Sequence, residues 1–343
     1  VMKITTVGID LAKNLFQVHG VDERGKTVLK KQLKRDQMMA FFTNLPACLI
    51  GMEACGSAHY WANKLQRLGH TVKLMAPQFV KPYVKTNKND VADAEAICEA
   101  VSRPNMRFVP IKNSEQQAVL ALHRARQGFV KARTAQANQI RGLLAEHGII
   151  IPKGIAYIGK HLPEILEDGE NGLPGSFRIL IKRLGDHLKE LDRHTQELEV
   201  QIQNWHRDST ASRKLAKIPG IGPITASALV ASVGDAKNFE NGRQLAAWLG
   251  LVPRQNSSGG KQTLLGISKR GDSYLRTLLI HGARAVLRVA ERQAHQANSW
   301  LAGVMERRNY NVAAVALANK NARIVWALLA HDREFEADYG AEV

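Results

Sequence analysis

Short apolar runs alternate with amphipathic stretches over residues 1–112. Runs rich in β-branched and large apolar residues predict strands, and apolar residues at helical spacing predict the helices between them. The predicted strands are Lys3–Ile9, Leu15–Val21, Lys26–Leu33, Ala47–Met52, Thr71–Ala76 and Arg107–Ile111, and the predicted helices are Gln37–Leu45, Ser57–Leu68 and Val91–Val101. Successive strands followed by helix–strand units indicate a mixed α/β domain.

The pattern changes to helix over residues 113–207. No proline occurs between Ser114 and His147, and a loop rich in Gly and Pro follows at Gly148–Gly175. A second helix then carries a heptad stripe, interrupted by Thr195, at Ile181, Leu184, Leu188, Leu191, Leu198, Ile202 and Trp205. This stripe indicates either an antiparallel helical stalk or a dimerising coiled coil, and the spacing does not choose between them.

Residues 208–333 form a mostly helical domain, and residues 334–343 form an acidic tail. Within this domain, Lys217–Ala226 has the pattern helix, Pro-Gly-Ile-Gly turn, helix. Gly220 and Gly222 permit a tight turn whose amides, with the next helix N-terminus, can bind a phosphate. This pattern is typical of helix-hairpin-helix proteins, which bind a nucleic-acid backbone without reading bases. A purely structural helical corner is the alternative.

Charge indicates the kind of partner. The 48 Lys and Arg residues against 31 Asp and Glu leave a net charge of +17, which predicts a polyanionic partner, nucleic acid. The surplus gathers in two blocks, 101–150 and 251–333, and so indicates two nucleic-acid surfaces. The cysteines, Cys48, Cys55 and Cys98, exclude a disulfide scaffold, and no Cys/His cluster has zinc spacing. Without a signal peptide or an apolar run near the roughly 20 residues of a membrane span, we expect a bacterial cytoplasmic protein with no membrane partner.

Four carboxylates in the first domain are candidate metal ligands. Asp10 and Glu53 each follow an apolar strand, at the edge where open α/β sheets place their sites. Asp90 and Asp93 lie three residues apart at a helix start, on one helix face. Taken singly, Asp90 could be an N-cap and Asp93 an acid that favours the helix dipole. Together, clustered carboxylates predict a divalent cation, Mg²⁺ or Mn²⁺, and two-metal phosphodiester chemistry.

A Gly/Ser-rich loop, Asn256–Gly260, supplies a candidate nucleophile. Ser258 precedes Gly259, which permits close approach of a nucleic-acid backbone. Cations stabilise an alkoxide and a phosphate together. We therefore expect the basic residues near Ser258 in sequence to surround it and to stabilise both groups: Arg254, Lys261, Lys269 and Arg270. A flexible polar loop is the alternative.

The order of these motifs resembles the insertion sequence 110 family of transposases, including its insertion sequence 1111 branch. The motifs cover essentially the whole chain: GID, GME, DVADA, IPGIGPITASALVA, GLVPRQNSSGGK and GISKRGDSYLRTLLIHGARA. The resemblance implies an N-terminal RuvC-like RNase H fold with a DEDD metal site at Asp10, Glu53, Asp90 and Asp93. It also implies that Ser258 is a nucleophile, with Ser257 one residue earlier as the alternative.

The same resemblance implies a DNA recombinase guided by a structured RNA from the element, which pairs with donor and target DNA. It further implies a homo-oligomer, a dimer to tetramer, in which one protomer's RuvC-like domain meets another's serine domain. The Arg-rich stretch Leu122–Arg141 and the last domain are the expected RNA-binding surfaces. The alternatives are a hydrolytic Holliday-junction-type nuclease, a non-catalytic nucleic-acid-binding protein and a sugar-kinase- or actin-like ATPase.

Overall fold

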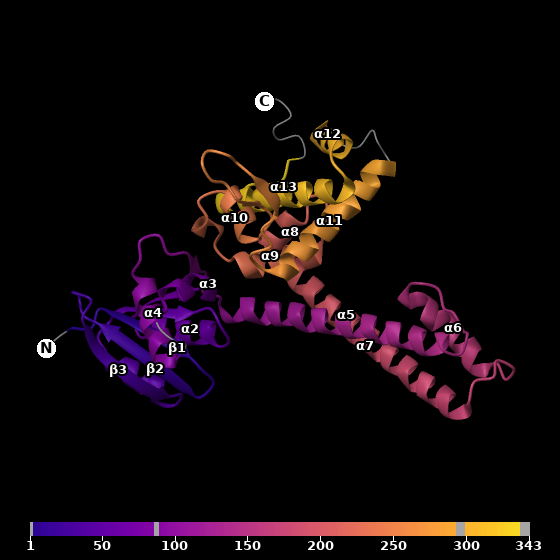
Figure 1. Cartoon of the computed structure of the whole chain (residues 1–343), viewed down its shortest axis with the longest axis horizontal. Coiled ribbons are helices and arrows are strands. Elements are labelled where there is room, and N and C mark those ends of the chain that lie inside the picture. Colours follow the sequence, from indigo (N-terminus) through magenta and orange to yellow (C-terminus); the bar gives the residue numbers. More distant parts are fainter. Residues whose placement is uncertain (1–2, 86–88, 293–298, 337–343) are drawn as a thin grey trace. The chain divides into compact units, whose positions relative to one another are not determined.

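The computed structural model describes residues 3–85, 89–292 and 299–336 (Figure 1). The chain divides into two compact units, Val1–Ser114 and Glu115–Val343, and each is described by itself. The predicted boundary between residues 207 and 208 lies inside the second unit, and a separate domain from residue 208 stays a prediction.

A six-stranded sheet forms the centre of the first unit, with strand order β3-β2-β1-β4-β5-β6. The first three strands form an antiparallel meander, β4 and β5 continue the sheet parallel to β1, and β6 pairs antiparallel to β5. The strands are β1 (Thr6–Leu11), β2 (Leu15–Val21), β3 (Thr27–Lys34), β4 (Leu49–Glu53), β5 (Thr71–Met75) and β6 (Phe108–Val109). The predicted mixed α/β fold is therefore confirmed.

Helices cover both faces of this sheet. One face carries the apolar side chains of β1 and β4, such as Ile9 and Met52, under α1 and α2. The other face carries Gly8, where an added Cβ would lie 2.3 Å from the Ala94 carbonyl oxygen, so α4 packs directly on the backbone of β1. The helices are α1 (Gln37–Thr43), α2 (Ala58–Arg67), α3 (Pro77–Val80), the short 3₁₀ helix η1 (Lys81–Tyr83) and α4 (Asp90–Val101).

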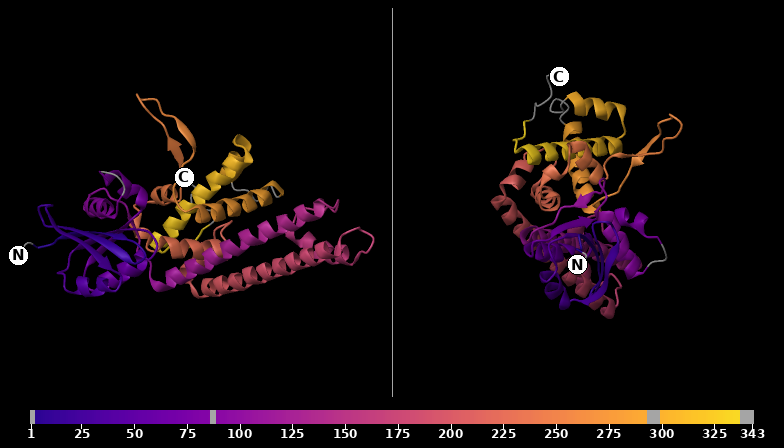
Figure 2. Two further views of the ribbon diagram at one scale, coloured as in Figure 1. Left: turned by 60° about the horizontal axis from the view of Figure 1, so that its bottom comes forward. Right: turned by 90° about the vertical axis from the view of Figure 1, so that its left-hand side faces the viewer.

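Two long antiparallel helices, α5 (Ser114–Ala145) and α7 (Gly175–Asp208), open the second unit and run side by side (Figures 1 and 2). Arg126 Nε donates to Glu199 Oε1 at 2.8 Å, and Gln136 Oε1 lies 2.8 Å from His187 Nδ1. In these contacts, higher residue numbers on α5 pair with lower residue numbers on α7, so the two helices are antiparallel. The heptad stripe therefore packs within one chain. The structure selects the antiparallel stalk from the two readings of the stripe.

The predicted loop Gly148–Gly175 contains a helix, α6 (Ile155–Glu167), so that prediction was wrong. Ile158 and Leu162 of α6 are buried in the core of the stalk. Pro163 lies within α6 although proline removes an amide donor from a helix interior, and this residue hid the helix from the sequence pattern. Burial of the apolar side of α6 outweighs the lost hydrogen bond.

A helical core completes the second unit. Its elements are α8 (Thr210–Leu215), α9 (Pro223–Val233), the 3₁₀ helix η2 (Ala236–Asn238), α10 (Gly242–Trp248), α11 (Ser273–Arg292), α12 (Ser299–Arg307) and α13 (Tyr310–His331). Alanine and leucine side chains of α9, α11 and α13 fill this core. The predicted acidic tail begins with an ion pair at 2.6 Å between Glu334 and Lys217. The rest of this tail, residues 337–343, lies outside the described residues.

Among the described helices, α13 alone is long and apolar enough to cross a membrane by length and composition, with a window of mean hydropathy 1.3. The apolar sequence of α13 is interrupted by Lys320 and Arg323, and a single helix of this kind is weak evidence for a membrane span. Core helices meet the same criterion, and Ala314, Ala318, Ala322 and Val325 of α13 are fully buried in the helical core. The helix is therefore part of the packing of the second unit.

Candidate functional site

Asp10 and Glu53 lie next to each other at the carboxyl edge of the sheet. The parallel strands β1 and β4 pair Gly8 with Gly51 and Ile9 with Met52, so Asp10 and Glu53 follow at the same level. Because side chains alternate along a strand, both acids belong to the face of Gly8 and Gly51, which α4 covers. The two strand ends thus carry carboxylates on the side of the sheet where α4 begins.

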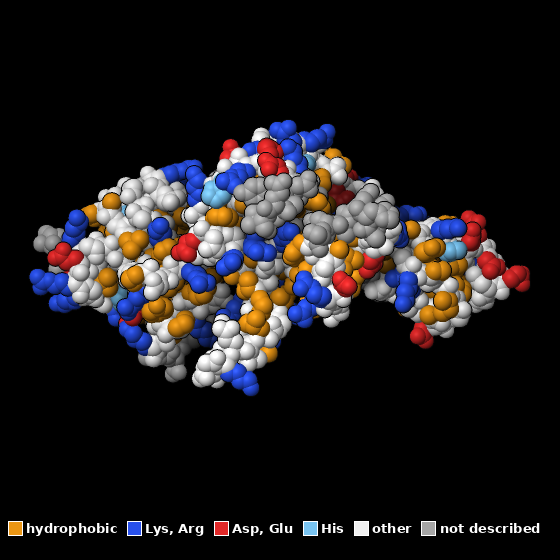
Figure 3. All heavy atoms as spheres, turned by 90° about the horizontal axis from the view of Figure 1, so that it is seen from above, with side chains coloured by type: hydrophobic (Ala, Val, Ile, Leu, Met, Phe, Trp, Pro, Cys, Tyr) orange, Lys and Arg blue, Asp and Glu red, His pale blue; other side chains and the backbone are white. Residues whose placement is uncertain are grey.

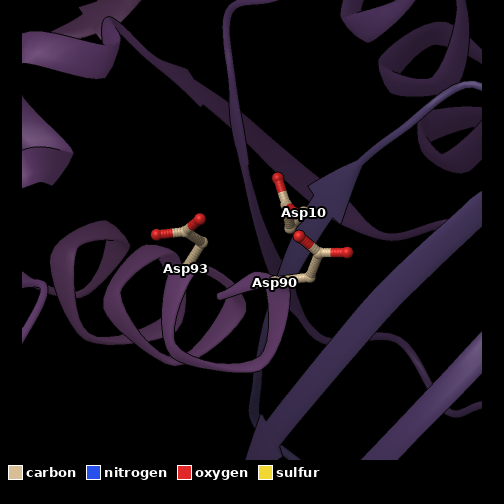
Figure 4. A group of neighbouring side chains, drawn as sticks. All are labelled: Asp10, Asp90 and Asp93. Atoms are coloured by element: carbon tan, nitrogen blue, oxygen red, sulfur yellow. The ribbon is translucent and has the colours of Figure 1, made fainter. Parts of the chain in front are cut away.

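The first turn of α4 supplies two more carboxylates. Asn89 is its N-cap, because the side chain of Asn89 accepts a hydrogen bond from the Ala92 amide at 2.8 Å. Asp90 is therefore not the cap, and that alternative interpretation was wrong. Asp10, Asp90 and Asp93 each offer one oxygen, and these three oxygens lie within 4.8 Å of one another (Figure 4). Asp10 and Asp93 are half-buried, whereas Asp90 is exposed.

Glu53 lies beside this cluster but outside its 4.8 Å limit. Its position is marked by Cys55, two residues further along the chain. Burial raises the pKa of the Cys55 thiol, and the carboxylates of Glu53 and Asp10 raise it further. Both acids are thus close enough to repel a thiolate at Cys55. Three of the four predicted carboxylates meet, and the fourth lies beside Asp10 on the neighbouring strand.

The donor set fits a small divalent cation. Carboxylate oxygens are the ligands that Mg²⁺ and Mn²⁺ prefer. Opposite ligands of an octahedral ion with bonds of about 2.1 Å lie roughly 4.2 Å apart, close to the observed spread of the three oxygens. With the N-cap role taken by Asn89, Asp90 and Asp93 are first-turn acids, which the helix dipole favours and which a cation site would use.

The predicted serine loop is the tip of a β-hairpin, formed by β7 (Pro253–Gln255) and β8 (Leu264–Ile267), that projects away from the helices of its unit (Figure 2). Ser258 and Lys261 form a bridge around Gly259 and Gly260, whose φ values are 56° and 77°. Two successive positive φ values define the tight turn that glycine pairs favour in hairpins. The Gly-Gly pair is the sequence signal that could have predicted this hairpin, in place of the flexible loop.

The hairpin distinguishes the two candidate serines. The Ser257 hydroxyl oxygen accepts a hydrogen bond from the Thr263 amide at 3.3 Å and so helps to close the hairpin. The Ser258 side chain is exposed and makes no hydrogen bond to the residues that the structure describes. Lys261 is exposed directly across the turn from Ser258. Both serines are exposed, and they differ in that the Ser257 hydroxyl takes part in closing the hairpin.

The other predicted cations lie along the hairpin. Arg254 is exposed on β7, whereas Lys269 and Arg270 follow β8 at the base, where the Lys269 amide donates to the Gly250 carbonyl at 3.1 Å. From Ser258 to Pro253, five residues of strand span about 16 Å. Their nearness in sequence predicted that Lys269 and Arg270 lie around Ser258. That prediction was wrong, because both lie at the base of the hairpin. Of the four cations, Lys261 is the one across the turn.

The Pro-Gly-Ile-Gly turn joins α8 to α9 as predicted. Gly220 has a φ of 85° and packs against α11, where an added Cβ on Gly282 would lie 1.8 Å from the Gly220 carbonyl oxygen. An added Cβ on Gly220 would lie 2.8 Å from the Gly282 carbonyl oxygen, so packing and the positive φ both favour glycine at position 220. Gly222 is exposed as the N-cap of α9, so the amide end of this helix faces solvent.

Charge on the surface follows the composition. In the view of Figure 3, Lys and Arg side chains are spread over the face, while several Asp and Glu side chains gather at the right-hand end, where α6 lies. The exposed side of α11 is basic as well, with Arg284, Arg288 and Arg292. Large parts of the described surface can thus contact phosphates.

Comparison with known proteins gives the family. Residues 7–149 match a family model described as a transposase of the DEDD IS110 type, and residues 212–298 match the model of the transposase IS116/IS110/IS902 family. A probable family 20 transposase of Pseudomonas aeruginosa is 55% identical over 332 residues, which are 96% of this chain and 98% of that protein. The chain belongs to the IS110 family of transposases.

Two further relatives span nearly the same length. The transposase for insertion sequence element IS1328 of Yersinia enterocolitica is 46% identical over 95% of this chain and 96% of its own. The transposase for insertion sequence element IS1111A of Coxiella burnetii is 45% identical over 97% of this chain and 91% of its own. The predicted resemblance is confirmed, and an activity that cuts and rejoins DNA follows from the family, as does DNA as the substrate.

Proposed function

We propose that this transposase cuts and rejoins DNA in two transesterifications, through a covalent phosphoserine link and a RuvC-like metal site. The observation that carries the proposal is the meeting of Asp10, Asp90 and Asp93 within 4.8 Å, from a strand end and a helix start. An antiparallel meander that continues into parallel strands, with helices on both faces, is consistent with a RuvC-like RNase H fold.

Asp10, Asp90 and Asp93 would hold the cation, and Glu53 would complete the set from the neighbouring strand. Mg²⁺ or Mn²⁺, when bound, supplies positive charge that polarises the scissile phosphate. Without such charge, the carboxylates would repel the phosphate that they must approach. The same acids fix where the phosphate lies, at the carboxyl edge of β1 and β4.

Ser258 supplies the nucleophile. Its Oγ forms a bond to the scissile phosphorus and loses its proton, while the bond from phosphorus to one strand end breaks and that end leaves as a protonated hydroxyl. In the second step a strand hydroxyl attacks the phosphoserine, and the Ser258 hydroxyl is regenerated. The number of phosphodiester bonds is conserved, so no ligase is required. Lys261, across the turn, offsets the negative charge that develops.

The proposal also includes a guide RNA and a homo-oligomer, a dimer to tetramer. The net charge of +17 supports a second polyanion beside DNA. Gly222 at the N-terminus of α9 and the hairpin cations Arg254, Lys269 and Arg270 are proposed backbone contacts. The helical stretch Leu122–Arg141 is a proposed RNA surface.

A hydrolytic nuclease would use the same carboxylates with water as the nucleophile, and one denaturing gel separates the two mechanisms. Full-length protein is incubated with Mg²⁺ and labelled DNA from the ends of its own element, together with RNA transcribed from that element. Wild type and Ser257→Ala should form a protein–DNA adduct that survives denaturation. Ser258→Ala and Asp10→Asn should form none, and Asp10→Asn should still bind DNA. Glu23→Gln, an exposed acid in the β2–β3 turn, is the matched control and should form the adduct.

Each other outcome has a definite meaning. Loss of the adduct in Ser257→Ala alone moves the nucleophile by one residue. Cleavage without any adduct in wild type replaces the proposal with a hydrolytic nuclease. Full activity in Asp10→Asn, or in EDTA, refutes the metal site.

A further inference from the structure

Two neighbouring cavities lie on the first unit and share Arg35. The smaller, of about 400 Å³, is lined by Arg35 and by two turns, Leu11–Lys13 and Cys55–Ser57. The larger, of about 640 Å³, has a lining that includes Lys34, Arg35, Asp36, Met39, Tyr60 and Trp61. We call the two cavities together the Arg35 groove.

The smaller cavity lies at the same edge of the sheet as the carboxylates. Leu11 directly follows Asp10, and Cys55 lies two residues beyond Glu53. A DNA strand whose scissile phosphate lies at Asp10 would pass around this edge to place its next nucleotides in the smaller cavity, because the larger cavity belongs to the α1 and α2 side of the sheet, opposite α4.

Cations dominate the polar lining of the groove. Lys13, Lys34 and Arg35 are exposed, against one acid in the lining, Asp36. Arg35 is held in place at the junction of the cavities, because its Nη1 donates to the Lys13 carbonyl at 3.2 Å. Its guanidinium also lies 5.3 Å from the Trp61 ring centroid. A fixed guanidinium is suited to a phosphate between two bound nucleotides.

The turn from β4 into α2 lines the smaller cavity just before the N-terminus of α2. Ser57 has a φ of 66°, a left-handed conformation that is uncommon for serine, and it is the N-cap of the ten-residue helix α2. Amides at a helix N-terminus favour an anion. The turn Cys55–Ser57 and the residues Lys13 and Arg35 line one cavity, so phosphate is the group that it suits.

The larger cavity offers an aromatic platform. Tyr60 is 47% exposed, although it is an aromatic residue on a helix that packs on the core. Its ring packs nearly perpendicular to the buried Trp61 ring, with centroids 5.2 Å apart. Exposed aromatic rings beside cations are typical of sites that bind unpaired nucleotides by stacking.

We infer that the Arg35 groove binds unpaired DNA next to the scissile phosphate. Lys13, Arg35 and the turn Cys55–Ser57 bind a phosphate in the smaller cavity, and the adjoining base stacks on Tyr60 in the larger one. A volume of about 640 Å³ lies within the roughly 300–1,000 Å³ of sites for small organic groups. Stacking on Tyr60 requires a base that is free of its partner, as bases are where strands exchange. This inference rests on the proposed function, because the proposed function puts the scissile phosphate at the carboxylates.

Photocrosslinking tests the groove directly. The probe is a short single-stranded oligothymidylate with one iododeoxyuridine, bound to the full-length protein with Ca²⁺ in place of Mg²⁺. We expect an adduct that mass spectrometry maps to Tyr60. Tyr60→Ala should weaken binding of this probe by about 5- to 150-fold, the range measured for loss of one stacked base, and Tyr60→Phe should keep binding near wild type. Arg35→Gln should lower the slope of log affinity against log salt by about 0.7, as expected for one lost phosphate contact.

Two variants in the same unit serve as matched controls. Phe108→Ala removes another exposed aromatic ring, on β6, and Lys26→Gln removes an exposed cation in the β2–β3 turn. Both should bind the probe like wild type. Equal losses in the controls, or crosslinks that map elsewhere with Tyr60→Ala unchanged, overturn the inference. A crosslink at Tyr60 with an oligouridylate but not with the DNA probe overturns the assignment to DNA.

The two proposals can fail separately. If the groove variants bind the probe like wild type while wild type forms the phosphoserine adduct, the groove is wrong and the proposed function stands. If Tyr60 crosslinks as expected while no adduct forms at Ser258, the proposed function fails and the groove remains a DNA site.

Discussion

At the scale of single residues, His123 is the clearest case of a side chain whose charge is fixed by its surroundings. Its Nδ1 lies 3.0 Å from the Tyr274 hydroxyl and its Nε2 lies 3.1 Å from the Ser227 hydroxyl. Burial, with a further effect from Arg126, lowers the pKa of His123 to about 4. The neutral imidazole therefore joins α5 to α9 and α11, the stalk to the helical core.

This low pKa predicts a stability that is lost in acid. Unfolded histidine has a pKa near 6.5, so between pH 6.5 and 4 the unfolded chain binds more protons at this site than the folded chain. The free energy of unfolding should fall by about 2 kcal/mol from pH 7.5 to 5 through His123 alone. Urea unfolding at the two pH values measures the fall. It should be smaller by that amount in His123→Gln and unchanged in His281→Gln, an exposed control on α11. Equal falls in all three proteins would contradict the prediction.

At the scale of elements, close backbone contacts set how the helices pack. Gly282 lies inside α11, where alanine is favoured over glycine by about 0.5–1 kcal/mol. At this position, however, an added Cβ would lie 1.8 Å from the Gly220 carbonyl oxygen. The Pro-Gly-Ile-Gly turn can approach α11 because neither residue has a side chain.

Gly282→Ala should therefore destabilise the protein by roughly 1–3 kcal/mol, as overpacking does. Gly142, inside α5, is the matched control, because an added Cβ there meets no described atom within 4 Å. Gly142→Ala should stabilise by about 0.5–1 kcal/mol. Thermal unfolding of both variants measures the difference, and opposite signs are expected. A stabilised Gly282→Ala protein would show that the turn moves away from α11 at little cost.

Local patterns predicted most elements of the first unit. The strand Leu15–Val21 was predicted with its observed bounds, and α4 was predicted to within one residue at its start. Such signals depend on residues close in sequence. They mispredict elements that are stabilised by contacts between residues far apart in the chain. Pro163 made the segment of α6 look like a loop, although this helix is stabilised by burial against α7. The contact of Gly8 with Ala94 likewise joins residues far apart in the chain.

The candidate site divides in the same way. Asp10 and Glu53 could be predicted because each ends an apolar strand, and Asp90 and Asp93 because they share a helix face. The role of Asn89 as the cap depends on backbone geometry that the sequence does not show. The Arg35 groove could not be predicted, since Arg35 and Tyr60 are ordinary surface residues until the fold brings them to one cavity.

At the scale of the whole molecule, the net charge of +17 supports the proposed guide RNA as a second polyanion beside DNA. Protein purified from cells that express the whole element should therefore contain a discrete RNA, whereas protein expressed without the non-coding ends of the element should not. Recombination in a purified system should stop after ribonuclease treatment and return when that RNA is added back. Steady recombination of DNA by RNA-free protein would remove the guide from the proposal, although the transposase activity would stand.

The hairpin that carries Ser258 also limits how this chain can change its length. Its base is fixed, because Gly250 and Gly271 pack against the backbone of Arg270 and Trp248, and its tip is closed by two glycines. Side chains alternate between the two sides of an extended arm, so one residue added to each arm would turn Ser258 to the opposite side. Two residues added to each arm would restore the side and move the serine outward by about 7 Å. The arms of this hairpin are therefore free to lengthen or shorten only in steps of two residues.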